Sequence, residues 1–451
     1  MRSSSETNPV PANTLSMVPP IAALAAAVLC TGLSFVGTDA GSGPASARPA
    51  GPLIVLTGNE KGFIRPCGCS KPALGGVHRR ATKLEALRKA EPGLFLASLG
   101  DLVVEGGLQQ RMKFETFLMS MEFMGYQAYA PGAGEFQLGL DYLAEMRSFG
   151  DCKFVGLNVF RGGKRFFEPS ARLGDSTIVV TGLVDAIEGV VGVEVRPAAA
   201  ALTAWLLTLD AAKDRPLVLF NGSEKAAKAL ASQVPQAWRA RMIIAFGGGY
   251  DGPARLDGTP VPVVSVGSKG RSLAYIRPRE EGVLSSFRLE EAIEGQEDVS
   301  AMLAGYRQSL ADEKLVEKYP RRPMKLKYVG DAACIECHED SCRLLDPTPH
   351  ERAWASLTVT GDHHDPECVS CHVTGWGDQT GFISEARTPK LINVTCEACH
   401  GPGERHVDLQ DPMPGGKLGK GFCKKCHDAD NSPHFDFKKY WPKIAHPPAG
   451  K

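Results

Sequence analysis

The sequence predicts an α/β domain followed by a smaller, mainly helical domain that contains few aliphatic side chains. A chain of 451 residues is too long for a single hydrophobic core, so we expect two domains joined by a linker. Between residues 53 and 266, short apolar runs alternate with helical stretches. After Tyr328 these runs almost disappear, and cysteine, histidine, proline and glycine dominate.

The alternating elements define the α/β domain. We expect strands at 53–57, 94–99, 152–159, 177–183, 216–220, 241–246 and 261–266, and helices at 77–90, 108–124 and 223–233. This order is typical of helices packed on a sheet. A long amphipathic helix is expected at 288–318, and the proline-rich stretch 319–323 then ends it. The expected organisation is an N-terminal leader at 1–50, the α/β domain at 51–287, a helix and linker at 288–327, and the cysteine-rich domain at 328–451.

The N-terminus resembles an export segment. Ile21 to Val36 is largely apolar, and Ala45-Ser46-Ala47 has an Ala-x-Ala cleavage pattern. A cleaved signal peptide and an uncleaved membrane anchor both remain open. Either one predicts an exported protein, periplasmic or anchored to the outer face of the cytoplasmic membrane. Acidic and basic side chains balance at 51 each, so no nucleic-acid partner is expected.

The cysteines carry the clearest chemical signal. Nine of the thirteen lie between Cys334 and Cys426, and eight of these form Cys-x-x-Cys pairs followed directly by histidine. The four motifs are Cys334/Cys337/His338, Cys368/Cys371/His372, Cys396/Cys399/His400 and Cys423/Cys426/His427. This is the attachment sequence of c-type haem, in which two thioethers hold the porphyrin and the histidine is the proximal iron ligand.

Two other interpretations explain the motifs less well. Zinc sites also use Cys-x-x-Cys pairs, but they do not require a histidine directly after the second cysteine. A disulfide framework leaves the histidines unexplained. About 124 residues with so little aliphatic content could not build an ordinary core, and four macrocycles would fill that interior. The sequence therefore predicts four covalently bound haem c groups.

The segments "YVGDAACIECHE", "PECVSCHVTGWG" and "NVTCEACHGPGERH" resemble the tetrahaem cytochrome c-554-like module of exported multihaem proteins, over residues 328–448. The resemblance implies that His350, His406 and His446 are distal iron ligands, which leaves one haem open or differently ligated. His434 is a less favoured ligand. We expect His363 and His364 to be solvated, with ligation of the fourth iron as the alternative, and Cys342 to be a buried or free thiol.

Residues 53–280 resemble the metallophosphoesterase domain of exported 5′-nucleotidases, through "LIVLTGNEKGF", "LASLGDL" and "GAGEFQLG". In that family two metal ions activate water, which requires several carboxylates and histidines. Here Asn59 and Lys61 replace the Asp-x-His motif, and the Gly-Asn-His-Glu motif reads GAGE at 132–135. The late Gly-Gly-His-x-His region contains no histidine. Asp101 and Glu135 remain as a vestigial metal site, so phosphoesterase activity is expected to be absent.

Cys67 and Cys69 lie just after the altered first motif. Thiols two residues apart seldom close an unstrained disulfide with each other. They could bind a soft metal or take part in thiol redox chemistry with Cys152, and a structural role is the alternative.

Together these features favour an exported electron-transfer protein over an enzyme. Its expected partners are redox proteins, such as other cytochromes or a quinol-linked complex, and the α/β domain would dock a partner or bind a ligand. One alternative is a multihaem oxidoreductase acting on a small nitrogen or sulfur compound at an open haem or at Cys67 and Cys69. An active metal-dependent nucleotidase is the least favoured alternative.

Overall fold

The computed structural model describes residues 51–446 except 67–70, 175, 278–282 and 416–417. The expected export segment and the thiols Cys67 and Cys69 lie outside the described residues. The chain from Ala50 onward forms one compact unit. No helix among the described residues is long and apolar enough to cross a membrane.

The α/β region is built on two six-stranded sheets. In spatial order the first sheet comprises β15 (Val283–Arg288), β14 (Ser272–Arg277), β1 (Ile54–Thr57), β2 (Phe95–Ser98), β3 (Ala128–Tyr129) and β4 (Lys153–Phe154). The second comprises β12 (Ala254–Leu256), β13 (Val263–Ser265), β11 (Ile243–Phe246), β10 (Arg215–Asn221), β8 (Ile178–Val184) and β7 (Ala171–Arg172). A small third sheet holds β6 (Lys164–Arg165), β5 (Val159–Arg161) and β9 (Glu194–Val195).

The two large sheets pack face to face because successive side chains of a strand point to opposite sides. In β1, Ile54 and Leu56 lie in the apolar core between the sheets, whereas Val55 faces the outer core. In β10, Leu217 belongs to the core between the sheets and Val218 to the outer core of the second sheet. Strands buried on both faces explain the continuous apolar runs of the sequence.

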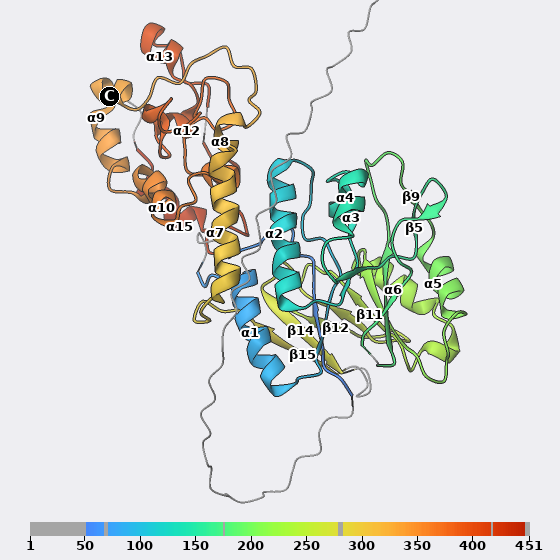
Figure 1. Cartoon of the computed structure of the whole chain (residues 1–451). Helices are drawn as coiled ribbons and strands as arrows, with labels where there is room; N and C mark the ends of the chain where they lie inside the picture. Colours follow the sequence, from blue (N-terminus) through green and yellow to red (C-terminus); the bar gives the residue numbers. More distant parts are fainter. Residues whose placement is uncertain (1–50, 67–70, 175, 278–282, 416–417, 447–451) are drawn as a thin grey trace, which may run out of the picture. The chain divides into compact units, whose positions relative to one another are not determined.

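Helices cover the outer face of each large sheet. The first sheet is covered by α1 (Val77–Ala90), α2 (Leu108–Met124) and α7 (Glu297–Asp312), which lie side by side (Figure 1). The second is covered by α5 (Ala198–Leu206) and α6 (Glu224–Ser232). Short helices α3 (Ala133–Phe136), α4 (Leu140–Met146) and α8 (Leu315–Lys318) and the 3-10 turn Gln236–Trp238 complete the region. The α/β class expected from the sequence is thus confirmed as a four-layer sandwich.

Two expected elements differ in the structure. Residues 283–288 form a strand paired with β14, and α7 begins only after Gln296, whose side chain accepts a hydrogen bond from the Val299 amide. Lys314 then adopts a left-handed conformation with φ 50° and separates α7 from α8, so the single helix at 288–318 is wrong. The expected strand at 152–159 is divided between β4 and β5, which belong to different sheets.

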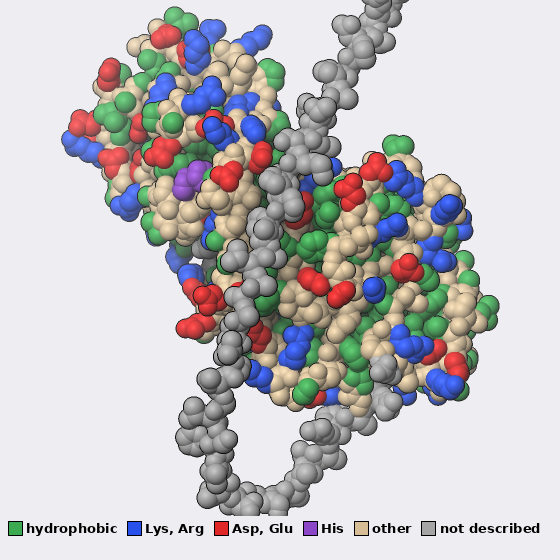
Figure 2. Space-filling view, in the orientation of Figure 1, with side chains coloured by type: hydrophobic (Ala, Val, Ile, Leu, Met, Phe, Trp, Pro, Cys, Tyr) green, Lys and Arg blue, Asp and Glu red, His purple; other side chains and the backbone are tan. Residues whose placement is uncertain are grey.

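The C-terminal region is mainly helical and has a small apolar core. Its helices are α9 (Ala332–Leu345), α10 (Ala353–Thr360), α11 (Pro366–Val369), α12 (Cys396–His400), α13 (Glu404–Leu409), α14 (Lys420–Cys423) and α15 (Phe437–Tyr440), with 3-10 turns at Pro349–Arg352, Pro389–Leu391 and Trp441–Lys443. One described apolar cluster fills part of it, formed by Val316, Tyr328, Trp354, Leu357, Val369, Val373, Phe382 and Leu391. On the face shown in Figure 2, basic and acidic side chains are interspersed over the surface.

Candidate functional site

The four cysteine motifs lie on short helical turns. The first motif is part of α9, whose backbone leaves helical geometry at His338, and the third motif coincides with α12. In the fourth motif the amide of His427 donates to the carbonyl of Cys423 at 2.9 Å, which closes one helical turn. Residues three and four positions apart share one face of a helix, so a regular turn presents both thiols and the histidine on the same side.

Cys337 differs from the other attachment residues that the sequence predicts. Its side chain is exposed to solvent, whereas the other seven motif cysteines are partly buried. Cys337 lies on an exposed part of α9. The two residues before it, Ile335 and Glu336, are exposed as well, and the helix backbone is kinked at the next residue, His338. The fold therefore partly buries Cys334 but leaves Cys337 at the surface. A thioether at Cys337 would lie at the solvent edge of its haem.

Three motif histidines face a second histidine at a common spacing. Since a metal–imidazole bond is about 2 Å long and the ring centre lies about 1 Å further out, two imidazoles on opposite sides of one metal ion have centres about 6 Å apart. The ring centres are 5.9 Å apart for His338 and His406, 6.0 Å for His427 and His350, and 5.6 Å for His400 and His446. These pairs fit an iron ion between the two rings.

Hydrogen bonds orient several of these rings. His372 Nδ1 lies 2.7 Å from the carbonyl oxygen of Ala353, and His406 Nδ1 lies 2.8 Å from that of Asp411. A carbonyl only accepts, so each Nδ1 donates its proton and leaves Nε2 as the free lone pair for a metal. The spacing of the three pairs and the tautomer of His372 and His406 therefore fit haem iron.

His372 differs from the other motif histidines. In the described part of the chain, no second histidine stands at the paired spacing from its ring. His363 and His364 contact each other at 4.0 Å, and His363 lies 6.0 Å from Trp354. Both side chains are partly exposed, and His363 Nδ1 is enclosed, so they keep only part of the expected contact with solvent. The ring of Trp354 covers one side of His363.

The motifs also contact one another. Cys334 lies within hydrogen-bonding reach of Cys396, and Cys426 within reach of Cys371. The first motif is therefore adjacent to the third, and the second to the fourth. Cys342 is a buried free thiol in α9, and burial raises its pKa to about 11, so it stays protonated at neutral pH.

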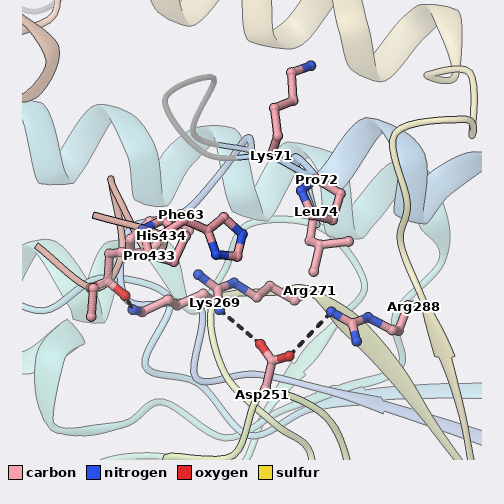
Figure 3. A pocket seen from close by; sticks show the side chains of 12 residues that line it. Phe63, Lys71, Pro72, Leu74, Asp251, Lys269, Arg271, Arg288, Pro433 and His434 are labelled. Atoms are coloured by element: carbon pink, nitrogen blue, oxygen red, sulfur yellow. Dashed lines mark hydrogen bonds and ion pairs between the residues drawn. The ribbon is translucent and has the colours of Figure 1, made fainter. Parts of the chain in front are cut away.

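His434 is exposed and takes no part in the histidine pairs just described. It lines a pocket of about 190 Å³ together with Phe63, Lys269 and Arg271 (Figure 3). Asp251 bridges Arg271 and Arg288 at the same pocket. His434 thus lies among cationic side chains and an aromatic ring rather than opposite a motif histidine. This position agrees with the prediction that His434 is a less favoured iron ligand.

The altered metal motifs of the α/β region lie where the loops after β1 and β2 meet. The Asn59 amide donates to the carbonyl of Gly100 at 2.6 Å, and the Lys61 amide donates to that of Asp101 at 2.8 Å. The Asn59 side chain donates to the carbonyls of Gly248 and Gly267 at 3.0 and 2.9 Å. Asn59 therefore joins three loops, while a carboxylate there could only accept hydrogen bonds.

Asp101 and Glu135 are bound to backbone amides. Glu135 is fully buried and accepts from the amides of Asp101, Leu102 and Gly132 at 3.2, 2.6 and 2.8 Å. Asp101 accepts from the Gly134 amide at 3.2 Å. Burial raises the pKa of both carboxyl groups, and the charge of Asp101 contributes to the value of about 8 for the pKa of Glu135. Both carboxyl groups thus serve as acceptors within the fold.

No group of three or more histidine, cysteine, aspartate or glutamate side chains that could hold a metal ion occurs among the described residues. Cys152 is buried in the outer core of the first sheet, and burial raises its pKa to about 12. Its thiol therefore stays protonated near neutral pH, and its packing is that of a core residue.

Comparisons with known proteins agree with this division of the chain. Residues 333–401 match the family described as cytochrome c554 and c-prime. The cytochrome c-554 of Nitrosomonas europaea is 33% identical over 91 residues, and the match covers 17% of this chain and 39% of that protein. This chain therefore spans well under half of the length of its curated relative.

The α/β region resembles solved phosphoesterases. A 5′-nucleotidase precursor from Thermus thermophilus superimposes with a TM-score of 0.50 at 18% identity, over 62% of each chain. A sulfate thiohydrolase from the same organism has a TM-score of 0.49 at 14% identity, over 59% of this chain and 62% of that one.

The C-terminal region of this chain thus carries a cytochrome c554 domain. It is fused to an α/β domain with the fold of 5′-nucleotidases, which confirms the fusion expected from the sequence. The matched residues 333–401 include the first three Cys-x-x-Cys-His motifs.

Two features of the site were not predicted from the sequence. Asn221 ends β10, and its side chain contacts Asp101, the Ala133 amide and the Leu99 carbonyl; a polar residue at the end of an apolar strand was the available signal. The acidic residues before the second motif, Asp362, Asp365 and Glu367, contact the α/β domain. Three acids within six residues were visible in the sequence, but their partners were not.

The network around Glu135 allows a test of the structural role of this residue. Replacing Glu135 with alanine leaves three buried backbone amides without their acceptor, and each costs about 1–3 kcal/mol. We expect Glu135→Ala to lower the free energy of unfolding by about 3 kcal/mol or more in urea denaturation. The exposed Glu105→Ala should change it by less than about 0.5 kcal/mol. Equal stability of both variants would contradict the structural role.

Proposed function

We propose that this protein is an exported tetrahaem electron-transfer protein. The observation that carries the proposal is the set of three histidine pairs whose ring centres lie 5.6–6.0 Å apart. Each pair joins a motif histidine to one of the histidines that the cytochrome resemblance implies. Bis-imidazole coordination leaves no open position on an iron, which suits electron transfer better than catalysis.

The residues would act as follows. The eight motif cysteines, the exposed Cys337 included, attach four haem c groups, and His338, His372, His400 and His427 are the proximal iron ligands. His406, His350 and His446 are distal ligands opposite His338, His427 and His400. Covalently bound haem c supplies reversible one-electron chemistry. The contacts between the first and third motifs, and between the second and fourth, keep the attachment sites close enough for electrons to pass along the set.

A second function is favoured by His372. Since no histidine in the described region pairs with it, the second haem would keep an open or weakly held sixth position. An open iron binds small molecules, so a multihaem oxidoreductase acting on a small nitrogen or sulfur compound is the alternative. The two functions differ in whether turnover of such a compound accompanies electron transfer.

Optical and EPR spectra of the haem-loaded protein test the ligand assignment. We expect four haems per chain by mass, three low-spin irons, and one high-spin iron that binds carbon monoxide when reduced. His350→Ala should convert a second iron to the high-spin, carbon monoxide-binding form. His434→Ala serves as the matched control and should leave the spectra unchanged. Four low-spin irons that ignore carbon monoxide would contradict the open second haem.

We propose that the α/β domain has no phosphoesterase activity. Asn59, Lys61 and Gly134 replace ligand and catalytic positions, and Asp101 and Glu135 are engaged by backbone amides. Two divalent ions require several converging carboxylates and histidines, which the described residues of this region do not bring together. The domain serves instead for docking.

Phosphate release from nucleoside monophosphates and p-nitrophenyl phosphate, with added manganese, magnesium or zinc, tests this assignment. We expect the wild-type rate to equal that of Asp101→Ala, because Asp101 is the one acidic ligand retained from the family's metal motifs. Manganese-dependent release that Asp101→Ala abolishes would restore the nucleotidase function.

Location and partners follow from the same chemistry. Haem c is attached outside the cytoplasm, so we place the protein in the periplasm or on the outer face of the cytoplasmic membrane, with the apolar N-terminal segment as signal or anchor. A redox protein or a quinol-linked complex would exchange electrons with it. The balanced net charge and the mixed surface in Figure 2 give no support to a nucleic-acid partner.

The lysines around the fourth motif suggest where an acidic redox partner docks. Six exposed lysines lie close to this motif in the sequence and form no ion pair with described residues: Lys420, Lys424, Lys425, Lys438, Lys439 and Lys443. The first motif is flanked by the exposed acids Glu336, Glu339 and Asp340. Opposite charges at the two motifs would orient an acidic partner toward the fourth.

Rates of oxidation by the ferricyanide anion test this surface. We expect Lys424→Glu/Lys425→Glu to lower the rate at low ionic strength by roughly threefold or more, because the local potential changes sign. The double variant Lys225→Glu/Lys228→Glu on α6 makes the same change in net charge far along the chain from the haem motifs. If both variants slow oxidation equally, net charge rather than this surface is responsible.

A further inference from the structure

The segment just before the second haem motif is held by the α/β domain through charged side chains. It contains Asp362, Asp365 and Glu367, directly followed by Cys368. Asp362 and Asp365 are buried, and Asp365 also accepts from the Glu367 amide to begin α11. Buried carboxylates need compensating charge or hydrogen bonds, so the source of their partners matters.

Arg65 supplies the main compensation. It lies in the loop after β1 that carries the altered Asn59 and Lys61 positions. Its Nη1 lies 2.6 Å from Asp362 Oδ2, and its Nη2 lies 3.4 Å from Asp365 Oδ2. Nη2 is also 3.6 Å from Cys368 Sγ, one of the two sulfurs that would attach the second haem. The Arg65 side chain is only 16% exposed, so water screens these contacts weakly.

The first turns of α2 hold the rest of the segment. Lys113, whose side chain is 4% exposed, lies 2.6 Å from both carboxylate oxygens of Glu367. Gln110 donates to Glu367 at 3.1 Å, and Gln109 donates to Asp365 at 2.8 Å. These contacts come from a helix of the outer layer whose other face packs in the apolar core of the first sheet.

A second guanidinium completes the set. Arg307 in α7 lies with its Nε 2.9 Å from Asp362 Oδ1, so Asp362 is bound by two arginines on its two oxygens. Arg65, Lys113 and Arg307 therefore balance Asp362, Asp365 and Glu367 in number. Two of the three acids before the second motif, Asp362 and Asp365, are buried, whereas Glu336, Glu339 and Asp340 beside the first motif are exposed to solvent.

We propose that the phosphoesterase-like domain is a built-in redox-tuning partner of the second haem, and that Arg65 is the positioning residue that raises its reduction potential. The proposal rests on the assignment of Cys368 and Cys371 as attachment residues. Reduction adds one electron to the iron and no proton is required from these residues. A nearby cation stabilises the added negative charge, whereas a nearby uncompensated carboxylate destabilises it.

The sign of the effect follows from this balance. Without Arg65, Asp362 keeps Arg307, but Asp365 loses the one ion pair that it makes with described residues, and the field at Cys368 becomes more negative. The ferric form of the second haem is then favoured. A tenfold change in the ratio of ferric to ferrous haem at a given potential corresponds to about 59 mV for one electron. Replacing Asp362 with asparagine removes a negative charge and should shift the potential in the opposite direction.

Spectroelectrochemical titration of the full haem-loaded chain tests the proposal. In Arg65→Gln, we expect one of the four one-electron transitions to move to lower potential by about 59 mV. This shift corresponds to a tenfold higher ferric-to-ferrous ratio of that haem at a given potential. Arg65→Lys should recover part of the shift, and Asp362→Asn should raise the same transition. Arg343→Gln is the control, because its ion pair with Glu339 beside the first motif is 68% exposed and screened.

The outcomes separate this proposal from the function on which it rests. If the wild type shows no reversible haem transitions, the electron-transfer function fails first. If the wild type titrates normally but Arg65→Gln leaves all transitions in place, or shifts all of them equally, the tuning role is overturned. If the same transition moves to lower potential in both Arg65→Gln and Asp362→Asn, loosened packing is the cause and the tuning role is also overturned. Damage to packing does not depend on the sign of the charge that is removed.

Discussion

The shortage of apolar side chains after Tyr328 is the constraint on which the C-terminal region depends. The apolar cluster of eight buried residues described there is small for a region of this length. Domains without enough apolar surface need metals, disulfides or other cross-links to fold. Here the motif turns carry the thiols and imidazoles that suit haem attachment, and hydrogen bonds from Nδ1 orient the rings of His372 and His406. Bound haem would supply the apolar surface that the side chains of this region lack.

The α/β domain shows the opposite arrangement. Its two sheets are fully packed by their own side chains, and the loops at the carboxyl ends of its strands are closed by hydrogen bonds from Asn59, Glu135 and Asn221. The loop after β1 continues from Asn59 to Arg65 and contacts the segment before the second cysteine motif. The α/β domain and the C-terminal region are thus joined through this loop.

The two-domain organisation and the long helices of the first sheet could be predicted from the sequence because their signals are local. The haem motifs, α1 and α2 depend on residues within a few positions of each other, and the ends of both helices were expected correctly. Strand β15 was not predicted, because it is defined by its pairing with β14 and not by a pattern within its own residues. The exposure of Cys337, the environment of Asn221 and the partners of Asp362 depend on how distant segments pack. No pattern within one segment encodes such packing. The contacts between the α/β domain and the segment before the second motif are therefore visible only in the structure.

Three residues without the freedom of glycine keep a left-handed backbone in the loops after β1 and β2: Asn59 with φ 58°, Lys61 with φ 52° and Asp101 with φ 50°. Such conformations cost of order 1 kcal/mol each and persist where the surrounding structure fixes them. Hydrogen bonds between the two loops hold this main-chain shape in place without glycine at these three positions. A comparison of folds follows the path of the main chain and not the side chains, so the likeness to a 5′-nucleotidase is visible at 18% identity.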